Sequence, residues 1–362
     1  MITPAISGPY THEKSSISRT MIWVMVALTP ATAFGIYQFG LPALWLFMIS
    51  ILACVISEAL CLYIARKPIK PFLFDGSAIL TGWLLAMTLP PWAPWWIAVV
   101  GALLAIVVGK QVFGGIGQNL FNPAMVARVA LLISFPYEMT SWVAPHPLFS
   151  ADTPGLIESL RITFDMTNEF DAVSSATILG HVKTELSRGL GLTDIWAGTF
   201  NPLKFATGSI AGSLGETSAL LLFAGGLLLL FTRIISWHIP VSMLLSISLL
   251  ATIFNGIDAE HYPNALFHLL SGATLLGAFF IATDLVTSPI TKTGQIIFGA
   301  SCGALVFIIR TWAGYPEGMA FAVMLMNGFT PMIDHYIKPR IYGRTRKGDP
   351  ITYDTEMESG ND

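Results

Sequence analysis

Long apolar runs recur along most of this chain, and they limit its fold more than any other feature. A helix needs about 20 mostly apolar residues to cross the hydrocarbon core of a bilayer. Of the 362 residues, 54% are hydrophobic and only 11% are charged, whereas soluble domains average about 25% charged residues. So few charges cannot cover a globular surface of this size. We therefore expect an all-α, polytopic integral membrane protein that is solvated largely by lipid.

The apolar runs predict about ten transmembrane helices, five on each side of a polar insert. The expected spans are 20–38, 41–65, 76–89, 93–109, 120–135, 217–235, 239–255, 265–282, 294–311 and 317–334. The corresponding regions are an N-terminal segment (1–19), a first half (20–135), the insert (136–216), a second half (217–337) and a tail (338–362).

Basic residues concentrate in the short loops on one side of the expected membrane. They are Lys14, Arg19, Arg66, Lys67, Lys70, Lys110, Arg233 and Lys292, followed by several in the tail, with Arg310 the main exception. Cytoplasmic loops are enriched in Lys and Arg. We therefore expect cytoplasmic N- and C-termini and an insert on the periplasm-like side. Outside the tail there is no basic stripe, which argues against nucleic acid as a partner.

The two apolar halves share matched small and proline residues. The segment Gly76–Gly82 aligns with Ser271–Gly277, and Pro123 aligns with Pro331. Because five spans per half is an odd number, such repeats have opposite topologies. Inverted repeats with interrupted helices are typical of transport proteins. The alternative is that Gly and Pro recur by chance, as they do in any polytopic protein.

The insert contains a short run of small and hydroxylated residues. It begins at Asp171 and continues through Ser174, Ser175 and Ala176 to Thr177. A threonine hydroxyl can form a phosphoester with a nucleotide cofactor. Attachment needs an open threonine, because a separate enzyme must reach it, and small neighbours leave that room. The alternative is an ordinary helix N-cap or loop.

A glycine- and asparagine-rich segment follows the fourth expected span. It includes Lys110, Gly114, Asn119 and Asn122. The glycines permit a close backbone approach and non-helical geometry, while the amides can donate and accept hydrogen bonds. No strand precedes the glycines, so this is not a dinucleotide-binding turn. Two interpretations of this segment stay open: a ligand site, or a helix break that only shapes the fold.

Ionisable residues within or beside membrane spans are candidates for an ion path. Glu58 and Asp284 are the two candidates here. The structural alternatives are an ion pair for Glu58 and a helix-end position for Asp284. No metal site is expected, because the histidines lack ligand spacing. Three cysteines cannot supply a four-ligand iron–sulfur site.

Several segments along essentially the whole chain resemble one family. It comprises the D subunit of Rnf complexes and the B subunit of sodium-pumping NADH:quinone oxidoreductases. The similar segments are Ser7–Tyr10, Phe74–Gly82, Phe113–Ala124, Asp171–Thr177, Ala282–Pro289 and Gly328–Asp334. The length fits the D subunit better, because the B subunit carries a longer N-terminal extension.

The run from Asp171 to Thr177 resembles the flavinylation motif Asp-x-x-(Ser/Thr)-Gly-Ala-Thr of this family, with Ser175 in place of the usual glycine. The resemblance implies FMN joined through its phosphate to Thr177. It also implies a second, non-covalent flavin, riboflavin, among the helices. The segment with Lys110, Gly114, Asn119 and Asn122 is a candidate for part of that site.

The resemblance further implies a function. The chain would be a bacterial inner-membrane subunit of an ion-translocating ferredoxin:NAD oxidoreductase. That complex is a redox-driven translocase, and it is active only when all its subunits are assembled. Implied partners are other membrane, flavin and iron–sulfur subunits, a flavin transferase for maturation, and membrane lipid. Whether Na⁺ or H⁺ moves is open. The rival function is a secondary transporter or channel without redox chemistry, because inverted repeats and broken helices alone would favour it.

Overall fold

The computed structural model describes residues 16–150, 153–164, 177–199, 202–339 and 343. Asp171, Ser174, Ser175 and Ala176 of the predicted motif lie outside the described residues.

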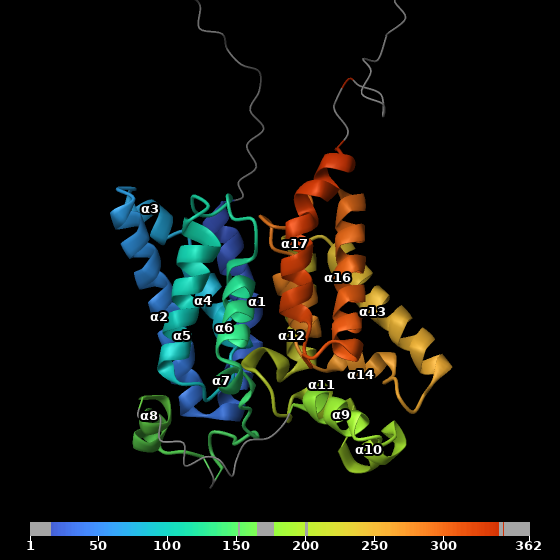
Figure 1. Cartoon of the computed structure of the whole chain (residues 1–362). Helices are drawn as coiled ribbons and strands as arrows, with labels where there is room; N and C mark the ends of the chain where they lie inside the picture. The colour runs from blue at the N-terminus through green and yellow to red at the C-terminus, as the bar shows by residue number, and fades with distance from the viewer. Residues whose placement is uncertain (1–15, 151–152, 165–176, 200–201, 340–342, 344–362) are drawn as a thin grey trace, which may run out of the picture.

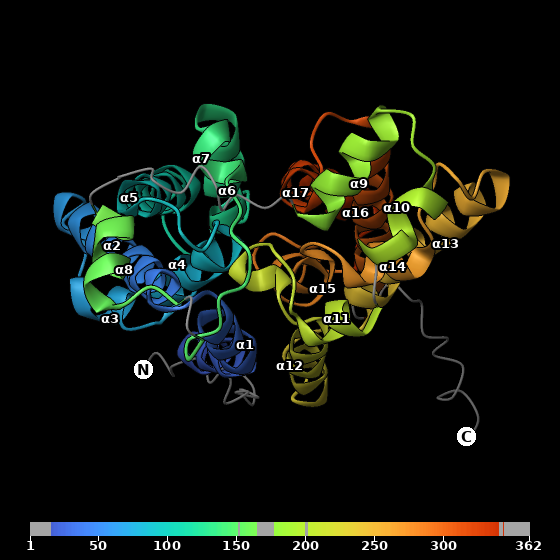
Figure 2. The ribbon, with the colours of Figure 1, turned by 90° about the horizontal axis from the view of Figure 1, so that it is seen from below.

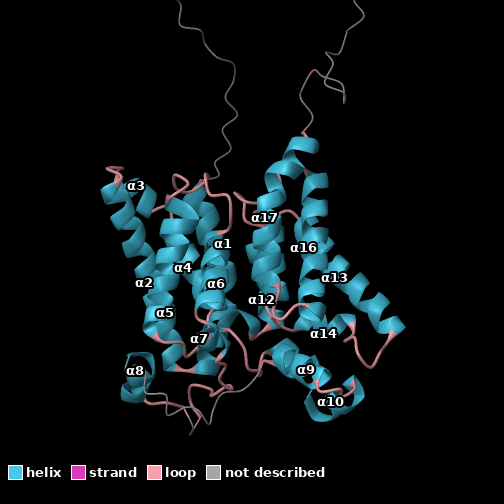
Figure 3. Ribbon diagram, viewed as in Figure 1, coloured by secondary structure: helices cyan, strands magenta, loops and turns pink. Residues whose placement is uncertain are grey.

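Helices form every regular element of the described chain (Figure 3). The first group consists of α1 (Ile17–Phe39), α2 (Leu41–Ile64), α3 (Ile69–Leu73), α4 (Ser77–Thr88), α5 (Trp95–Leu103), its π-helical continuation η1 (Leu104–Gln111), and α6 (Pro123–Ser134). Between the groups come α7 (Pro136–Thr140), α8 (Leu156–Phe164), α9 (Ile178–Ser187), α10 (Leu192–Thr199), α11 (Pro202–Thr207) and η2 (Leu214–Glu216). The second group consists of α12 (Ala219–Phe231), α13 (His238–Ile257), α14 (Ala265–Leu270), α15 (Thr274–Leu276), η3 (Gly277–Ile281), α16 (Lys292–Trp312) and α17 (Met319–Tyr336).

The two groups stand side by side, with the short helices α8, α9 and α10 at one end of them (Figures 1 and 2). Buried residues of both groups, such as Leu85 of α4, Leu276 of α15 and Met319 of α17, belong to one continuous apolar core. The two halves therefore pack as one unit, and the space between them is lined by both.

Five of the described helices are long and apolar enough to cross a membrane. They are Ile17–Phe39, Leu41–Ile64, Ile69–Thr88, His238–Ile257 and Lys292–Trp312, and three shorter apolar helices accompany them. Each of the ten expected spans overlaps helical structure, but ten membrane crossings and the inverted repeats stay predictions.

The outward faces of two long helices carry stripes of exposed aliphatic side chains. Leu52, Ile56 and Leu60 form one on α2, and Leu245, Leu249 and Ile253 form the other on α13, each residue 49–65% exposed. The spacing of four residues places each stripe on one helix face. Large exposed apolar patches mark membrane or partner surfaces. Together with the long apolar helices, they indicate a multi-pass membrane protein.

Close packing of α13 against α16 depends on two glycines in α16, Gly299 and Gly303. A Cβ at either position would overlap a carbonyl oxygen of α13, that of Ile239 or of Met243. Small residues four apart let membrane helices approach each other this closely.

Regular α geometry is interrupted at a polar site in each of the two helix groups. The helix after α5 becomes a π-helix at η1, which ends beside Lys110. In the second group, α14 ends at Leu270, and the chain resumes as α15 only after Gly272, whose φ is +63°. Irregular backbone at membrane depth is tolerated where protein groups satisfy it, and both departures adjoin the sites described next.

Candidate functional site

A buried ion pair joins η1 to α2 in the first half. The Lys110 ammonium nitrogen Nζ lies 2.6 Å from Oε1 of Glu58, and both side chains are at most 3% exposed. Gln111 Nε2 donates a second hydrogen bond to Glu58 at 2.9 Å. Glu58 thus has the basic partner that the structural alternative predicts. Because burying a single charge is costly, this pairing explains how both residues tolerate the interior.

Lys110 also reaches the beginning of α4. Its Nζ donates to Ser77 Oγ at 2.6 Å. The hydroxyl and backbone N–H of Ser77 donate to Asp75 Oδ1, at 2.5 Å and 2.7 Å. Gly76, between the two, has a φ of +84°, which lets the chain turn sharply into the helix. A short polar chain therefore runs from Glu58 through Lys110 and Ser77 to Asp75.

This chain borders a cavity between the two halves, which we call the Lys110 cavity. Its polar lining consists of Thr20, Ser77, Thr81, Lys110, Asn119, Asn122, Thr283 and Asp284, and its apolar walls include Leu84, Phe279 and Phe280. The empty space between the lining atoms is about 780 Å³, including the part open to its surroundings. Small-molecule sites are typically about 300–1,000 Å³ and mostly apolar, with a few polar groups.

The structure brings most of the predicted residues of this site together. Asn122 caps α6 by accepting from Ala124 N at 3.1 Å, and its Nδ2 donates to the Ile281 carbonyl of the second half at 3.4 Å. Asn119 Nδ2 donates to the Phe121 carbonyl at 3.1 Å. Asp284 accepts from Thr287 Oγ1 at 3.0 Å and from a backbone N–H.

Two predicted residues do not line this cavity. Gly114 lies outside it, and its carbonyl accepts from Lys67 Nζ at 2.9 Å. Glu58 is absent from the lining and connects to it only through Lys110. The segment therefore contributes its lysine and asparagines to the cavity, while this glycine shapes the backbone, with a φ of +119°.

Thr177 occupies the N-cap of α9. Its Oγ1 accepts from the backbone N–H of Gly180 at 3.2 Å, so the helix-cap alternative describes its position in this structure. The residue is 7% exposed, which differs from the expected open threonine. The start of α9 borders a second cavity, and Thr177 is part of its lining.

This second cavity, the Arg128 cavity, contains about 550 Å³ of empty space. Its polar lining includes Arg128 of α6, Thr177, Glu216 of η2 and Glu317, and its aromatic lining includes Trp142 and Tyr315. The arginine is 7% exposed. The sequence pointed to Thr177 but not to the charged groups that share its cavity.

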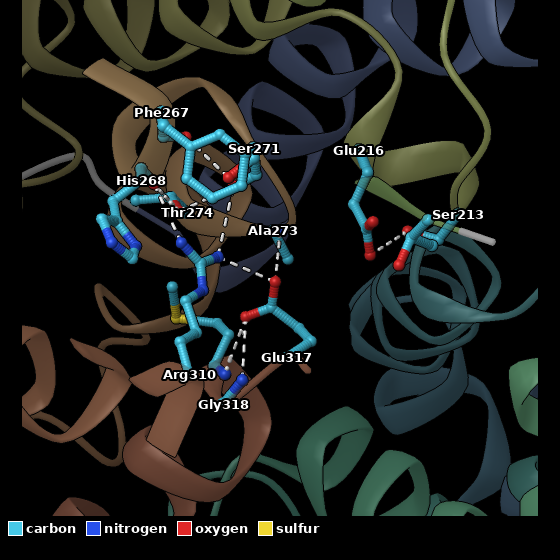
Figure 4. Close-up of polar contacts among 12 residues, drawn as sticks. Ser213, Glu216, Phe267, His268, Ser271, Ala273, Thr274, Arg310, Glu317 and Gly318 are labelled. Carbon is cyan, nitrogen blue, oxygen red and sulfur yellow. Dashed lines mark hydrogen bonds and ion pairs between the residues drawn. The ribbon is translucent and has the colours of Figure 1, made fainter. Parts of the chain in front are cut away.

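A network around Arg310 closes one side of this region (Figure 4). The guanidinium donates to the carbonyls of His268 and Ser271, at 2.9 Å and 3.1 Å, where α14 breaks. It also pairs with Glu317 at 2.8 Å. Glu317 in turn accepts from the backbone N–H groups of Ala273, Gly318 and Met319. One ion pair thus satisfies the backbone at the α14–α15 break and at the start of α17.

Glu216 lies beside this network, in the turn before α12 (Figure 4). Its one side-chain hydrogen bond in the described structure is from Ser213 Oγ, at 2.9 Å. Burial and the nearby Glu317 carboxylate raise the pKa of Glu216 to about 7. Although predicted to end the polar insert, the segment around Glu216 is buried: a Cβ on Gly215 would meet Leu276 and the Met87 carbonyl.

Lys183 holds α9 against the end of α16. Its Nζ donates to the carbonyls of Arg310 and Tyr315, each at 3.1 Å, and to that of Ala313. Partial burial lowers the pKa of this ammonium group. A cation beside the last carbonyls of a helix satisfies groups that lack intrahelical partners. This contact ties α9, the helix that Thr177 caps, to the end of α16.

Sequence reasoning missed the second charged cluster. A signal existed, because Arg128 and Arg310 both lie inside apolar runs, and a charge in such a run indicates a functional or structural partner. Arg310 pairs with Glu317, 7 residues further along the chain. Arg128 and Glu216, which line one cavity without a direct contact, are 88 residues apart. Within the described residues, no group of three His, Cys, Asp or Glu side chains could hold a metal ion.

Comparison with known proteins gives matches along nearly the whole chain. A family described as "NQR2, RnfD, RnfE" matches residues 5–343. The D subunit of the ion-translocating oxidoreductase complex of Halorhodospira halophila is 52% identical over 351 residues, which cover 97% of this chain and 98% of that protein. The protein of the same description from Stutzerimonas stutzeri is 54% identical over 93% of this chain and 95% of the relative.

Proposed function

Because the chain belongs to the NQR2, RnfD, RnfE family, we propose that it is a membrane subunit of an ion-translocating oxidoreductase complex. The observation that supports this most strongly is its 52% identity, along almost its whole length, to a protein of that description. In this proposal the subunit relays electrons between reduced ferredoxin and NAD, and the complex couples the transfer to Na⁺ or H⁺ translocation. The other membrane, flavin and iron–sulfur subunits are its partners, and lipid surrounds it in the bacterial inner membrane.

The first electron carrier in this proposal is FMN joined to Thr177. In its formation the Oγ1 of Thr177 loses its proton and bonds to phosphorus. The donor is a flavin dinucleotide held by a flavin transferase, and the pyrophosphate bond breaks with departure of a nucleoside monophosphate. The position of Thr177 supports this, because it caps the N-terminus of the ten-residue helix α9, and helix N-termini stabilise anions. Since Thr177 is buried, attachment must precede the packing of α9 or require its displacement.

The second carrier in this proposal is riboflavin in the Lys110 cavity. Lys110 already pairs with Glu58 at 2.6 Å, so the cavity suits a neutral ligand rather than an additional anion. The amides of Asn119 and Asn122 supply hydrogen-bonding groups, and Phe279 and Phe280 supply apolar wall. When bound, a flavin accepts and passes on electrons, while the protein holds and orients it.

The candidate ion path in this proposal uses the carboxylates near that cavity. Asp284 lines the cavity directly, and Glu58 reaches it through Lys110. Both residues therefore lie where a change in the charge of a bound flavin would be felt through a low-dielectric interior.

The test is covalent flavin in the full chain, co-expressed with a flavin transferase. The denatured protein should fluoresce under ultraviolet light in a gel. Thr177→Asn should abolish the signal, because asparagine preserves a cap acceptor but offers no hydroxyl for the ester. A fluorescent Thr177→Asn band would exclude Thr177 as the attachment site.

One structural feature favours the rival function of a transporter without redox chemistry. It is the interruption of α14 and α15 at Gly272, since broken helices are common at transporter binding sites. Absence of flavin from the wild-type chain made with the transferase would support that rival and contradict our proposal.

A further inference from the structure

Arg128 is a buried cation that lacks a contacting carboxylate. Only 7% of the residue is exposed. Within the described chain its guanidinium contacts the Met139 sulfur, 3.7 Å from one guanidinium nitrogen, and faces the ring of Trp142, whose centroid lies 6.0 Å from Cζ. No Asp or Glu oxygen of the described residues lies within 4.0 Å of it. Buried charges are normally paired, because desolvating an unpaired ion is costly.

The carboxylates that face Arg128 do not supply that partner. Glu317 is already paired with Arg310 at 2.8 Å. Glu216 contacts Ser213 rather than either arginine, and its raised pKa of about 7 leaves it partly protonated near neutrality. Among the described residues that line the Arg128 cavity, Arg128 is the one basic side chain, and Glu216 and Glu317 are the acidic ones. Because Arg310 neutralises Glu317, protonation of Glu216 leaves the charge of Arg128 without a countercharge in this lining, and one anion would supply it.

Thr177 brings the beginning of a helix to the same cavity. Both Thr177 and Arg128 line it, and α9 starts at the next residue, Ile178. The first N–H groups of a helix have no intrahelical acceptor, and the helix dipole is positive at that end. A phosphate on Thr177 would therefore meet backbone donors from one element and a guanidinium from another.

We propose that Arg128 is the counter-ion of the phosphodiester that joins FMN to Thr177, and so positions the covalent flavin. This inference rests on the proposed function and extends it to a residue outside the flavinylation motif. A guanidinium suits the role, because its planar array of donors matches phosphate oxygens. Arg128 is thus a positioning residue, and the cavity supplies the space in which the ester is held.

The first experiment compares wild type, Arg128→Gln and Arg128→Lys, each made as the full chain with the transferase. The matched control is Arg161→Gln, an exposed arginine on α8. In-gel fluorescence measures attachment. After non-covalent flavin has been removed, fluorescence anisotropy of the native protein measures how firmly the attached flavin is held. We expect anisotropy to fall in Arg128→Gln, to recover largely in Arg128→Lys, and to be unchanged in the control.

The second experiment needs no attached flavin. The same four proteins are made without the transferase and heated with inorganic phosphate or with chloride at equal ionic strength. We expect phosphate to raise the Tm of wild type and Arg128→Lys more than that of Arg128→Gln. The general stabilising effect of phosphate on proteins acts on all four and is removed by this comparison.

The outcomes separate the two proposals. Wild type without in-gel flavin would contradict the proposed function, and the phosphate experiment would still test the anion site. Wild type with flavin, combined with equal anisotropy and equal phosphate response in Arg128→Gln, would overturn the role of Arg128. Loss of both responses in Arg128→Gln, with rescue by lysine, would support it.

Discussion

Lys110 and Arg310 each contact a helix terminus, one in each half of the molecule. Lys110 Nζ lies 2.6 Å from Ser77 Oγ at the start of α4, and Arg310 lies 3.1 Å from the Ser271 carbonyl at the α14–α15 break. Each cation also pairs with a carboxylate, Glu58 or Glu317. In the sequence alignment of the two halves, Ser77 corresponds to Gly272, the residue after Ser271, and the inverted repeat stays a prediction.

The Glu58–Lys110 pair should be needed for stability. Glu58→Gln leaves the buried ammonium without its countercharge, and breaking a buried pair costs about 3–5 kcal/mol. We expect a clearly lower Tm in detergent. The double variant Glu58→Gln/Lys110→Met should recover part of the loss, because it removes both charges. Glu158→Gln, at an exposed position on α8, is the control, and an equal loss there would contradict the explanation.

Arginine rather than lysine should be required at position 310. Its guanidinium contacts two carbonyls and one carboxylate at once, and a lysine ammonium cannot reproduce this planar arrangement. Since hydrogen bonds to charged groups contribute about 1.5–3 kcal/mol each, Arg310→Lys should destabilise by at least about 1.5 kcal/mol. The control is Arg188→Lys, because Arg188 is 67% exposed in a surface pair with Glu185 and should change stability by less than about 1 kcal/mol. Thermal unfolding of the two variants is the measurement, and an equal change of Tm in both would contradict a specific requirement for arginine at position 310.

Close approach of α13 and α16 should fail when Gly303 gains a methyl group. Its Cβ would overlap the Met243 carbonyl, a backbone atom that cannot rotate away. Overpacking typically costs about 1–3 kcal/mol, so Gly303→Ala should lower the Tm. Gly256→Ala, also helical but with nothing within 4 Å of its Cβ, should not. A stable Gly303→Ala would show that the helices can separate at little cost.

Glu216 should make stability fall with rising pH. Its pKa is raised from 4.5 to about 7 by burial and by Glu317. Between these values the unfolded chain releases a proton that the folded chain retains, so folding loses stability as pH rises. The loss should reach about 3 kcal/mol above pH 7, at roughly 1.36 kcal/mol per pKa unit.

Glu216→Gln should remove this dependence, since glutamine does not ionise. The measurement is Tm against pH from 4.5 to 8, with Glu260→Gln, at an exposed position, as the control. Parallel curves for wild type and Glu216→Gln would contradict the assignment.

Much of the architecture follows from local pattern. The apolar runs predict helices at the right places, because a lipid environment demands long helical segments whatever their neighbours are. Boundaries were less predictable where tertiary contacts compete with local signals. The segment ending at Glu216 is polar enough for an external loop, yet it is buried against α1 and α4 because Gly35 and Gly215 leave room for it.

The candidate sites likewise have a part that the sequence predicts and a part that only the fold decides. Lys110, Asn119, Asn122 and Thr177 were identifiable from residue type and motif, because small residues and amides in unusual settings are local features. The groups that surround these residues in the fold were not identifiable from the sequence.

The sequence by itself determined a helical membrane protein of a recognisable family, with Thr177 as a marked residue. Only the tertiary structure decided that Glu58 neutralises Lys110, that Asp284 shares its cavity, and that Arg128 reaches the cavity of Thr177. The physical reason is that helix formation and lipid solvation depend on residues a few positions apart. Buried charges, in contrast, are stabilised by partners that the fold brings together from distant parts of the chain.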